Sequence, residues 1–505
     1  MSEPISTTWT FGEIVDALGD LVVAVAGARD TVLTGATADS RQALPGHCFV
    51  AVRGYTEDGM RHWPAARAAG ATALVCESAP PESSGVPWAR VRNGYAAAGL
   101  IAELVWGRPA DALELIGITG TNGKTTCAYL LDQILVDAGR QTGMIGTVAY
   151  KIGDQQIEAD RTTPMPFALQ ELLTRMREAC ATTVTLEVSS HALAQRRLGT
   201  AKFTAALFTN LTGDHLDYHH TMEEYYDAKR QLFVEDLRAG GHAVINVDTP
   251  YGQRLHDELT HAQKVHSHSF SMAGAEAEFQ LEQVETAVEG GRGVLRRNDG
   301  NEFTMRLQTP MIGHYNLCNV GCVAALALVL DVSPAVIKRC TARFHGAPGR
   351  LEPIRIPGKP AVFVDYAHTD DALENALKAL AAVKKHKLAV VFGCGGDRDP
   401  SKRPRMARIA EAWADRVYAT SDNPRSENSE AILDNIFAGF VHPERVARIP
   451  DRRQAIRTAL AEADPNDILL IAGKGHETYQ EINGVKHPFD DACEVRKALA
   501  ENVAQ

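Results

Sequence analysis

The strongest chemical signal in the chain is the segment GITGTNGKTT at residues 117–126. Its glycines let the backbone curl so that amide groups face an anion, and Lys124 can reach the outer oxygens of a bound polyphosphate. The hydroxyl group of Thr125 suits Mg²⁺, and a helix starting here adds partial positive charge. Ile118 stands where the usual G-x(4)-G-K-[ST] pattern has its first glycine. We therefore predict a phosphate-binding loop of shortened form.

Four polar or glycine-rich turns in the last third of the chain follow directly on apolar runs. The turns are DYAHTD, GCGGDRD, SDNPR and GKGHE, after the runs at 361–364, 388–392, 416–420 and 467–472. In an open parallel sheet, ligands bind beyond the carboxyl ends of the strands. We therefore expect the four turns to form one composite site.

Apolar periodicity indicates the elements that must position these groups. A strand-like run at 113–119 leads into the glycine-rich loop, and leucines and isoleucines at 130–135 give the spacing of a helix after it. Further strand candidates lie at 48–52, 71–77, 183–188, 205–208 and 243–247. Strands that alternate with helices predict an α/β protein with mostly parallel sheets.

Changes in the pattern of apolar runs and turn-rich segments along the chain predict three domains. A smaller N-terminal α/β domain spans 1–110, a central P-loop domain with a mostly parallel sheet spans 111–347, and a Rossmann-like domain spans 348–505. The length of 505 residues suits this number, because domains average roughly 150 residues.

The composition argues against several classes of protein. Lys and Arg number 52 and Asp and Glu 63, so the net charge of −11 disfavours general binding to nucleic acid or anionic membranes. The longest apolar run, near 322–330, is about half of the ~20 residues that a membrane span needs, and no signal peptide is recognisable. Nine cysteines without a CxxC pair indicate reduced thiols in the cytoplasm.

The loop GTNGKTT, taken with segments elsewhere, resembles the Mur ligases and their relatives, the folylpolyglutamate synthetases. These are ATP-dependent enzymes that join an amino acid to a carboxylate. The other segments, in that family's order, are the one from ADSR to DG at 38–59, RTTP at 161–164, LEVSSHAL at 186–193, FTNLTGDHLDYH at 208–219, DYAHT at 365–369, GCGGDRD at 393–399, DNPR at 422–425 and AGKGHE at 472–477. The resemblance spans nearly the whole chain and is specific as a set.

The resemblance implies a reaction of peptidoglycan precursor synthesis. ATP would phosphorylate the side-chain carboxylate of UDP-N-acetylmuramoyl-L-alanyl-D-glutamate, and the amine of meso-2,6-diaminopimelate would attack the acyl phosphate. Because two anions must meet, positioning and electrostatic stabilisation should dominate catalysis. The resemblance further implies ATP and Mg²⁺ as cofactors, these two substrates as partners, no nucleic acid, no membrane insertion, and a cytoplasmic monomer.

The same resemblance assigns roles to individual residues. Catalysis is expected from Lys124, Glu187, His215 and a carbamylated Lys229, with Thr125, Glu187 and His215 as metal ligands. ATP is expected at Gly120, Thr121, Asn122, Gly123, Lys124, Thr125, Thr126, Asn316, Asn319, Arg350 and Asp365, and the uridine-nucleotide substrate at Ser40, Thr162, Thr163, Ser189, Gln195 and Arg197. Diaminopimelate is expected at Arg398, Asp422, Asn423, Pro424, Arg425, Gly473 and Glu477. Structural alternatives stay open, such as a surface position for Lys229 and helix capping by the two asparagines.

The turn DNPR at 422–425 bears on which amino acid is added. Diaminopimelate carries a distal carboxylate and a distal ammonium, whereas lysine carries only the ammonium. Arg425 can bind the extra carboxylate bidentately, and Glu477 suits the ammonium. The alternatives are a lysine-adding ligase of the same family, a folylpolyglutamate synthetase and a non-catalytic nucleotide-binding regulator. Departures from the family pattern leave some loop geometry open, at Gly213, Ala347, Asp370 and Ser429.

Overall fold

The computed structural model describes residues 8–54, 57–80, 85–298, 300 and 303–501, so Tyr55 and Thr56 of the segment 38–59 lie outside the described residues. The chain forms two compact units. The first contains Met1–Ser271 and Ala325–Val332, and the second contains Met272–Ala324 and Ser333–Gln505.

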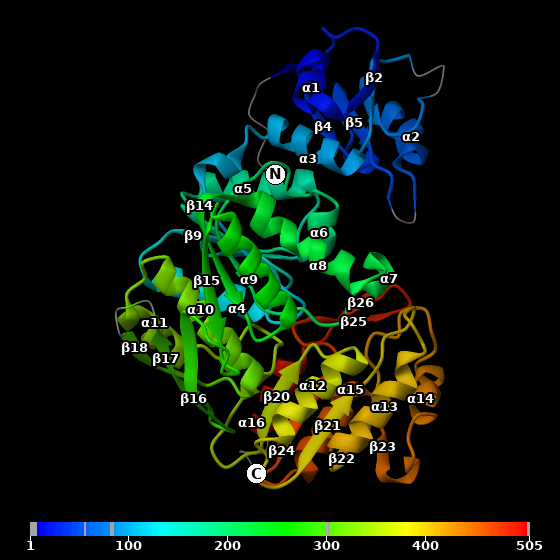
Figure 1. Ribbon diagram of the computed structural model, residues 1–505. Coiled ribbons are helices and arrows are strands. Elements are labelled where there is room, and N and C mark those ends of the chain that lie inside the picture. Colours follow the sequence, from blue (N-terminus) through cyan, green and yellow to red (C-terminus); the bar gives the residue numbers. More distant parts are fainter. Residues whose placement is uncertain (1–7, 55–56, 81–84, 299, 301–302, 502–505) are drawn as a thin grey trace. The chain divides into compact units, whose positions relative to one another are not determined.

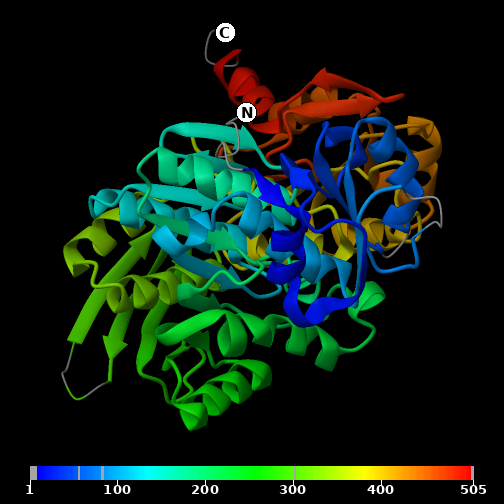
Figure 2. The same cartoon turned by 90° about the horizontal axis from the view of Figure 1, so that it is seen from above.

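The N-terminal part of the first unit is built on a five-stranded sheet of order β2-β7-β6-β5-β4. Side chains alternate across this sheet, so Cys48 and Val50 of β5 pack in the core cluster of α1 and α3, whereas Phe49 and Ala51 pack with α2. This part of the chain is drawn in shades of blue in Figures 1 and 2. The elements are β1 (Trp9–Thr10), α1 (Phe11–Leu18), β2 (Val22–Ala26), β3 (Val32–Leu33), β4 (Gly35–Thr37), β5 (His47–Ala51), α2 (Trp63–Ala68), β6 (Ala73–Cys76), β7 (Trp88–Val91) and α3 (Gly94–Val105).

The rest of the first unit carries a larger sheet, whose strands run in the order β11-β10-β9-β12-β8-β13-β14-β15. Strand β8 lies parallel between β12 and β13, whereas β10 pairs antiparallel with both β9 and β11. The elements are β8 (Glu114–Thr119), α4 (Lys124–Asp137), β9 (Thr142–Ile145), β10 (Ala149–Ile152), β11 (Gln155–Glu158), α5 (Pro166–Glu178), β12 (Thr183–Glu187), α6 (Ser190–Ala194), β13 (Phe203–Phe208), α7 (Leu216–His219), α8 (Met222–Gln231), β14 (Leu237–Asn246), α9 (Pro250–Ala262) and β15 (His266–Ser271). The glycine-rich loop therefore follows a strand that has parallel neighbours on both sides.

The second unit begins with an antiparallel sheet that the sequence analysis did not predict. Strand β17 (Gly290–Arg297) pairs with β16 (Phe279–Ala287) and with β18 (Phe303–Thr309). Helix α10 (His314–Val329) belongs to this unit as far as Ala324, and α11 (Pro334–Arg343) follows.

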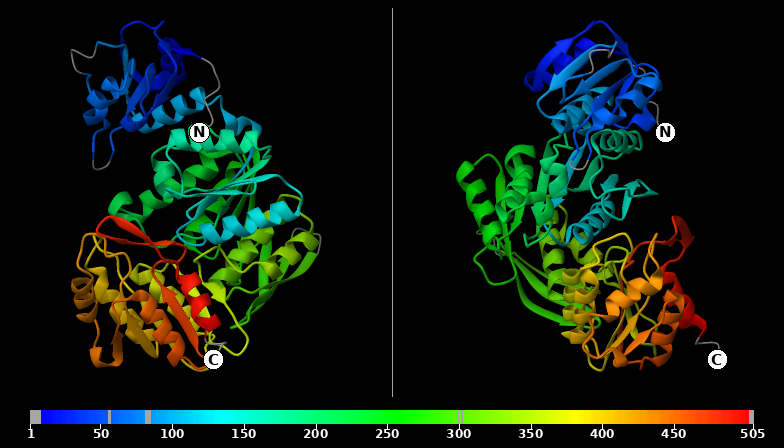
Figure 3. Two further views of the ribbon diagram at one scale, coloured as in Figure 1. Left: turned by 180° about the vertical axis from the view of Figure 1, so that it is seen from behind. Right: turned by 90° about the vertical axis from the view of Figure 1, so that its right-hand side faces the viewer.

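The C-terminal part of the second unit is a six-stranded sheet of order β19-β20-β24-β21-β22-β23, parallel except for β19. Val390 and Phe392 of β21 pack with α12, α13 and α14, whereas Ala389 and Val391 pack with α15 and α16. The elements are β19 (Glu352–Ile354), β20 (Ala361–Asp365), α12 (Asp370–Ala381), β21 (Leu388–Phe392), α13 (Lys402–Trp413), β22 (Arg416–Ala419), α14 (Ser429–Phe437), β23 (Val446–Arg448), α15 (Arg452–Glu462), β24 (Ile468–Ala472), β25 (Tyr479–Ile482), β26 (Val485–Pro488) and α16 (Asp491–Glu501). Strands β25 and β26 form a separate hairpin, drawn in red in Figure 3.

The predicted α/β class with mostly parallel sheets is confirmed. The runs at 113–119 and 183–188 contain β8 and β12, the run at 205–208 falls within β13, and the run at 243–247 overlaps the last four residues of the longer β14. The domain boundaries at residues 110 and 347 stay a prediction. Within the described part of the chain, no helix combines the length and apolar character needed to cross a bilayer.

Arg452, the first residue of α15, has a fully buried side chain that contacts the chain at the end of β24 and just beyond the end of β22. It pairs with Asp491 at 2.6 Å, both side chains being fully buried. Its Nη1 also donates to the carbonyl oxygen of Ser421 (3.4 Å) and its Nη2 to that of Ala472 (2.9 Å). These carbonyls precede the turns SDNPR and GKGHE or lie at their start, so one guanidinium group anchors both turns.

We expect Arg452→Met to lower the free energy of unfolding by about 3–5 kcal/mol, because it leaves Asp491 buried without a partner. The matched control is Arg457→Met on the same helix, whose pair with Glu501 is largely exposed and should contribute about 1 kcal/mol or less. Urea unfolding followed by circular dichroism measures both changes. Equal losses in the two variants would contradict the anchoring role.

Candidate functional site

The loop between β8 and α4 has the backbone conformation that a phosphate-binding loop needs. Gly120 and Gly123 have φ of +146° and +89°, which side-chain-bearing residues rarely adopt. The ammonium group of Lys124, the first residue of α4, donates to the carbonyl oxygens of Gly120 and Thr121, each at 2.9 Å. A flexible cation at the amino end of a helix therefore lies beside the curled backbone, an arrangement that binds anions.

The loop is held from the side by the residues that follow β13. The hydroxyl of Thr209 donates to the carbonyl oxygen of Asn122 (2.6 Å), and Asn210 accepts the amide of Asn122 through its side chain (3.0 Å) and that of Thr121 through its backbone (2.9 Å). Thr126 is buried in the first turn of α4. These contacts fix the loop shape independently of any ligand.

Glu187 links the loop to the end of the neighbouring strand β12. Its carboxylate is fully buried; Oε2 accepts from the hydroxyls of Thr125 (3.0 Å) and Thr147 (3.0 Å), and Oε1 accepts from the amide of Thr147 (2.9 Å). Carboxylate and hydroxyl oxygens are ligands that Mg²⁺ prefers. The sequence analysis missed Thr147, because nothing local marks it as a partner of Glu187.

Lys229 lies in the interior of the protein, which excludes the surface alternative. Its side chain is 1% exposed, and its ammonium group donates to the carbonyl oxygen of Gly120 (2.9 Å) and lies 4.7 Å from the ring centre of Tyr225. Burial, reinforced by the nearby charge of Lys124, holds the pKa of Lys229 well below its ordinary value. Lys229 is therefore more readily present as the neutral, nucleophilic amine than a surface lysine is.

His215 begins helix α7 in a left-handed backbone conformation, with φ of +54°. Its ring lies edge-on to that of His191, with centroids 4.9 Å apart, and its Nε2 lies 3.4 Å from a carboxylate oxygen of Asp214. Burial lowers the pKa of His215, so the imidazole is neutral at pH 7 and able to bind a metal. In the described residues, no three His, Cys, Asp or Glu side chains converge on one metal position. The predicted set of Thr125, Glu187 and His215 contains only two such side chains and stays a prediction.

The residues predicted to hold the substrate peptide form a chain of contacts beside Glu187. The hydroxyl of Thr163 donates to the carbonyl oxygen of Glu187 (2.8 Å) and accepts the amide of Ser189 (3.0 Å). Arg197, largely buried, donates to the carbonyl oxygen of Thr163 (2.7 Å) and twice to the side-chain oxygen of Gln195 (2.9 and 2.7 Å).

Two further predicted substrate residues lie at the edges of this group. The hydroxyl of Thr162 shares a hydrogen bond with that of Thr147 (3.1 Å), which connects it to the Glu187 network. Ser40 lies in the N-terminal part of the first unit, in the 3₁₀ turn Ser40–Gln42 between β4 and β5, and is half-buried.

The remaining residues predicted to contact ATP belong to the second unit. Asp365 ends β20, accepts the amide of Leu351 (2.6 Å), and has its pKa raised to about 6 by burial. The guanidinium carbon of Arg350 lies 5.2 Å from the ring centre of Tyr366, and its Nε is buried without a hydrogen-bond partner. Asn316 and Asn319 are buried on α10, and the side-chain Nδ2 of Asn316 donates to the carbonyl oxygen of Ile312 (2.9 Å).

A cavity of about 410 Å³ lies at the carboxyl end of the C-terminal sheet. All four predicted turns contribute to it, and so do six of the seven residues predicted to bind diaminopimelate; Pro424 is the exception. Its charged lining residues are the cations Arg398, Lys402, Arg405 and Arg425 and the acids Asp370, Asp399, Asp422 and Glu477. A pocket with both signs of charge suits a ligand that itself carries both signs.

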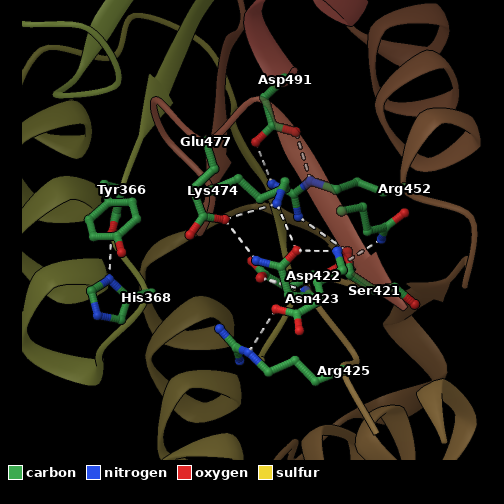
Figure 4. A network of polar contacts seen from close by, with 12 residues as sticks. Tyr366, His368, Ser421, Asp422, Asn423, Arg425, Arg452, Lys474, Glu477 and Asp491 are labelled. Atoms are coloured by element: carbon green, nitrogen blue, oxygen red, sulfur yellow. Dashed lines mark hydrogen bonds and ion pairs between the residues drawn. The ribbon is translucent and has the colours of Figure 1, made fainter. Parts of the chain in front are cut away.

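Arg425, labelled in Figure 4, is held by contacts with two other segments, the hairpin and the turn GCGGDRD. Its backbone has φ of +50°, and its amide donates to the carbonyl oxygen of Glu481 on the hairpin (3.0 Å). Its Nη1 donates to the carbonyl oxygen of Gly396 (2.7 Å), and its Nε lies 3.4 Å from the Glu481 carboxylate. The sequence analysis missed the hairpin, although the alternating segment YQEINGVKHP gives a signal for one.

A phosphate-binding loop after a central parallel strand, together with a charged pocket on a second α/β unit, defines a P-loop protein with a separate ligand site. Family models match most of the chain: "Mur ligase family, catalytic domain" at 32–103, "Mur ligase middle domain" at 118–328 and "Mur ligase, glutamate ligase domain" at 349–475. The chain belongs to the Mur ligase family.

Curated relatives are similar over nearly their whole length. The UDP-N-acetylmuramoyl-L-alanyl-D-glutamate–2,6-diaminopimelate ligase of Chlorobaculum tepidum is 45% identical, covering 95% of each chain, and that of Gloeobacter violaceus is 42% identical, covering 93% of this chain and 94% of the relative. A solved structure of a ligase with the same name has a TM-score of 0.70 at 32% identity and covers 98% of this chain and 100% of the other. A Mycobacterium tuberculosis folylpolyglutamate synthase, at 20% identity over 75% of this chain and 92% of the other with a TM-score of 0.59, shares the fold.

Gly120→Ala should distort the loop, because the new Cβ would lie 2.0 Å from Oγ1 of Thr209 and 3.0 Å from the carbonyl oxygen of Asn210. The matched control is Gly139→Ala, where φ is also positive (+85°) but no atom lies within 4 Å of the new Cβ. We expect the control to lose about 1–2 kcal/mol from backbone strain alone, and Gly120→Ala to lose clearly more. Denaturant unfolding tests this, and similar losses would show that the loop is not tightly held.

Proposed function

We propose that the protein adds meso-2,6-diaminopimelate to UDP-N-acetylmuramoyl-L-alanyl-D-glutamate with consumption of ATP. The observation that carries the proposal is the cavity of the second unit, in which Arg425 and Glu477 offer opposite charges from two neighbouring turns. Relatives at 40–45% identity carry the name of this ligase. We further propose that it acts as a cytoplasmic monomer, and a sequence with nine cysteines and no CxxC pair suits a reducing compartment.

The first chemical step depends on the loop of the first unit. Its amides and Lys124 bind the β- and γ-phosphates of ATP, which offsets the repulsion between the γ-phosphate and the incoming carboxylate. Thr125 and Glu187 supply oxygens for Mg²⁺, which adds further positive charge when bound. Arg197 and Ser189 orient the D-glutamyl group, whose side-chain carboxylate attacks the γ-phosphorus and releases ADP.

The second step depends on the pocket of the second unit. The guanidinium group of Arg425 binds the distal carboxylate of diaminopimelate, and Glu477 binds its distal ammonium group. With that end fixed, the other amine attacks the carbonyl carbon of the acyl phosphate. The tetrahedral intermediate collapses to an amide and releases phosphate.

Lysine is the less suitable acceptor. It has no distal carboxylate, so Arg425 would keep only its contacts with Gly396 and Glu481 and would gain none from the acceptor, at a cost in transition-state binding that corresponds to about 10³-fold or more. A folylpolyglutamate synthetase would have no use for this pair of charges. A regulator without catalysis would not need Lys124 on the loop as well as the hydrogen-bonded pair of Thr125 and Glu187.

The test supplies ATP, Mg²⁺ and the UDP-dipeptide, adds either meso-diaminopimelate or L-lysine, and follows ADP release with mass detection of the product. We expect turnover with diaminopimelate and about 10³-fold lower kcat/KM with lysine. Preference for lysine would overturn the assignment of Arg425, and absence of turnover with both amino acids would favour the folate or regulator alternative.

We also propose that Lys229 is carbamylated, which would convert a buried cation into an anion with metal-binding oxygens. The reaction requires a neutral amine to attack CO₂, and burial, which lowers the pKa of Lys229 well below its ordinary value, makes that form more abundant than in a surface lysine. Protein equilibrated with ¹³C-bicarbonate at pH 7 should give a carbamate carbon resonance. The signal should vanish in Lys229→Met and persist in the exposed-site control Lys202→Met; a spectrum without the resonance, or one unchanged in Lys229→Met, would refute the modification.

A further inference from the structure

Lys474 is a fully buried cation at the acceptor pocket that the proposed mechanism leaves without a role. It follows β24 in the turn GKGHE, and its side chain has no exposed area. Its ammonium group donates to Oε2 of Glu477 (2.9 Å) and to Oδ1 of Asn423 (3.1 Å) (Figure 4). Burying an ammonium group is costly unless it is paired. The two contacts therefore hold Lys474 in place, and Lys474 in turn positions the side chains of Glu477 and Asn423.

The contacts fix which atoms of Asn423 face the pocket. Oδ1 accepts from Lys474 and from the amide of Glu481 (2.9 Å), which assigns the oxygen of the side-chain amide. Nδ2 is then the donor, and it donates to Oε2 of Glu477 at 2.7 Å. One N–H of Asn423 is left for a ligand.

The same contacts select one oxygen of Glu477. Oε2 accepts from both Lys474 and Asn423, so this oxygen is committed to the protein. Glu477 lines the cavity, and its other oxygen, Oε1, has none of these contacts. The carboxylate is thus held in one orientation before an acceptor amino acid arrives.

We propose that Lys474 is a positioning residue of the acceptor site, which orients Glu477 and Asn423 so that Oε1 of Glu477 receives the distal ammonium group. The inference rests on the proposed function, because it assigns the ammonium group to Glu477. Holding both side chains in advance lowers the entropy lost when the acceptor binds. Lys474 itself acts through these two neighbours and needs no contact with the reacting atoms.

The test is a double-mutant cycle on kcat/KM for diaminopimelate with the variants Lys474→Met, Glu477→Gln and the combination of both. Glu477→Gln should lower kcat/KM about a hundredfold and Lys474→Met about tenfold, chiefly through KM for diaminopimelate, with KM for ATP unchanged. If Lys474 acts through Glu477 and Asn423, the double variant should lose clearly less than the product of the two single losses, because the effect through Glu477 is already absent in Glu477→Gln. The matched control is Lys486→Met. The ammonium groups of Lys486 and Lys474 lie 4.0 and 5.6 Å from the centre of the same Tyr479 ring, but Lys486 is exposed.

Independent losses that multiply to about a thousandfold, parallel changes in KM for ATP, or wild-type kinetics in Lys474→Met would overturn the positioning role. Lys474→Met could fail to fold because Glu477 is left without its counter-charge. The double variant removes both charges, so its kcat/KM compared with that of Glu477→Gln still tests the positioning role. The wild-type reaction separates the two proposals. If the wild type used only lysine, the proposed function would fail, while the same cycle measured with lysine would still test Lys474.

Discussion

A buried charge must be paired, and the pocket of the second unit depends on this constraint. Arg452, paired with Asp491, also holds the carbonyl oxygens of Ser421 and Ala472, where the two central turns of the pocket begin. Closer to the cavity, Lys474 donates to the side chains of Asn423 and Glu477, one from each turn. Both buried cations therefore have partners within the protein, and the groups that face the cavity are oriented by the fold.

In the first unit, the fold likewise places the groups that would bind phosphate. The loop follows β8, a strand with parallel neighbours on both sides, and Glu187 at the end of the neighbouring strand β12 accepts a hydrogen bond from Thr125 at the start of α4. Backbone amides, the Lys124 cation and hard oxygens therefore gather at one end of one sheet. Lys229 adds a buried amine at the same carbonyl group that Lys124 contacts, that of Gly120.

Local sequence patterns predicted the strands and the turns because both signals are short-range: apolar runs of strand length, then glycine or polar residues. The same patterns did not reveal which side chains meet. Thr147 pairs with Glu187 40 residues away, and Lys474 with Asn423 51 residues away, so each contact exists only once the sheet has formed. The antiparallel strands β16–β18 were missed because their half-exposed, polar sequence lacks the apolar runs on which the strand predictions relied.

The central claim is that Arg425 selects the acceptor by its distal carboxylate. Four values of kcat/KM test it most directly: wild type and Arg425→Met, each with meso-diaminopimelate and with L-lysine. We predict that the wild type prefers diaminopimelate by about 10³-fold and that Arg425→Met reduces this preference to about tenfold or less, since the variant has no cation for the carboxylate. A variant that lost activity equally with both amino acids, and so kept the wild-type preference, would contradict the account.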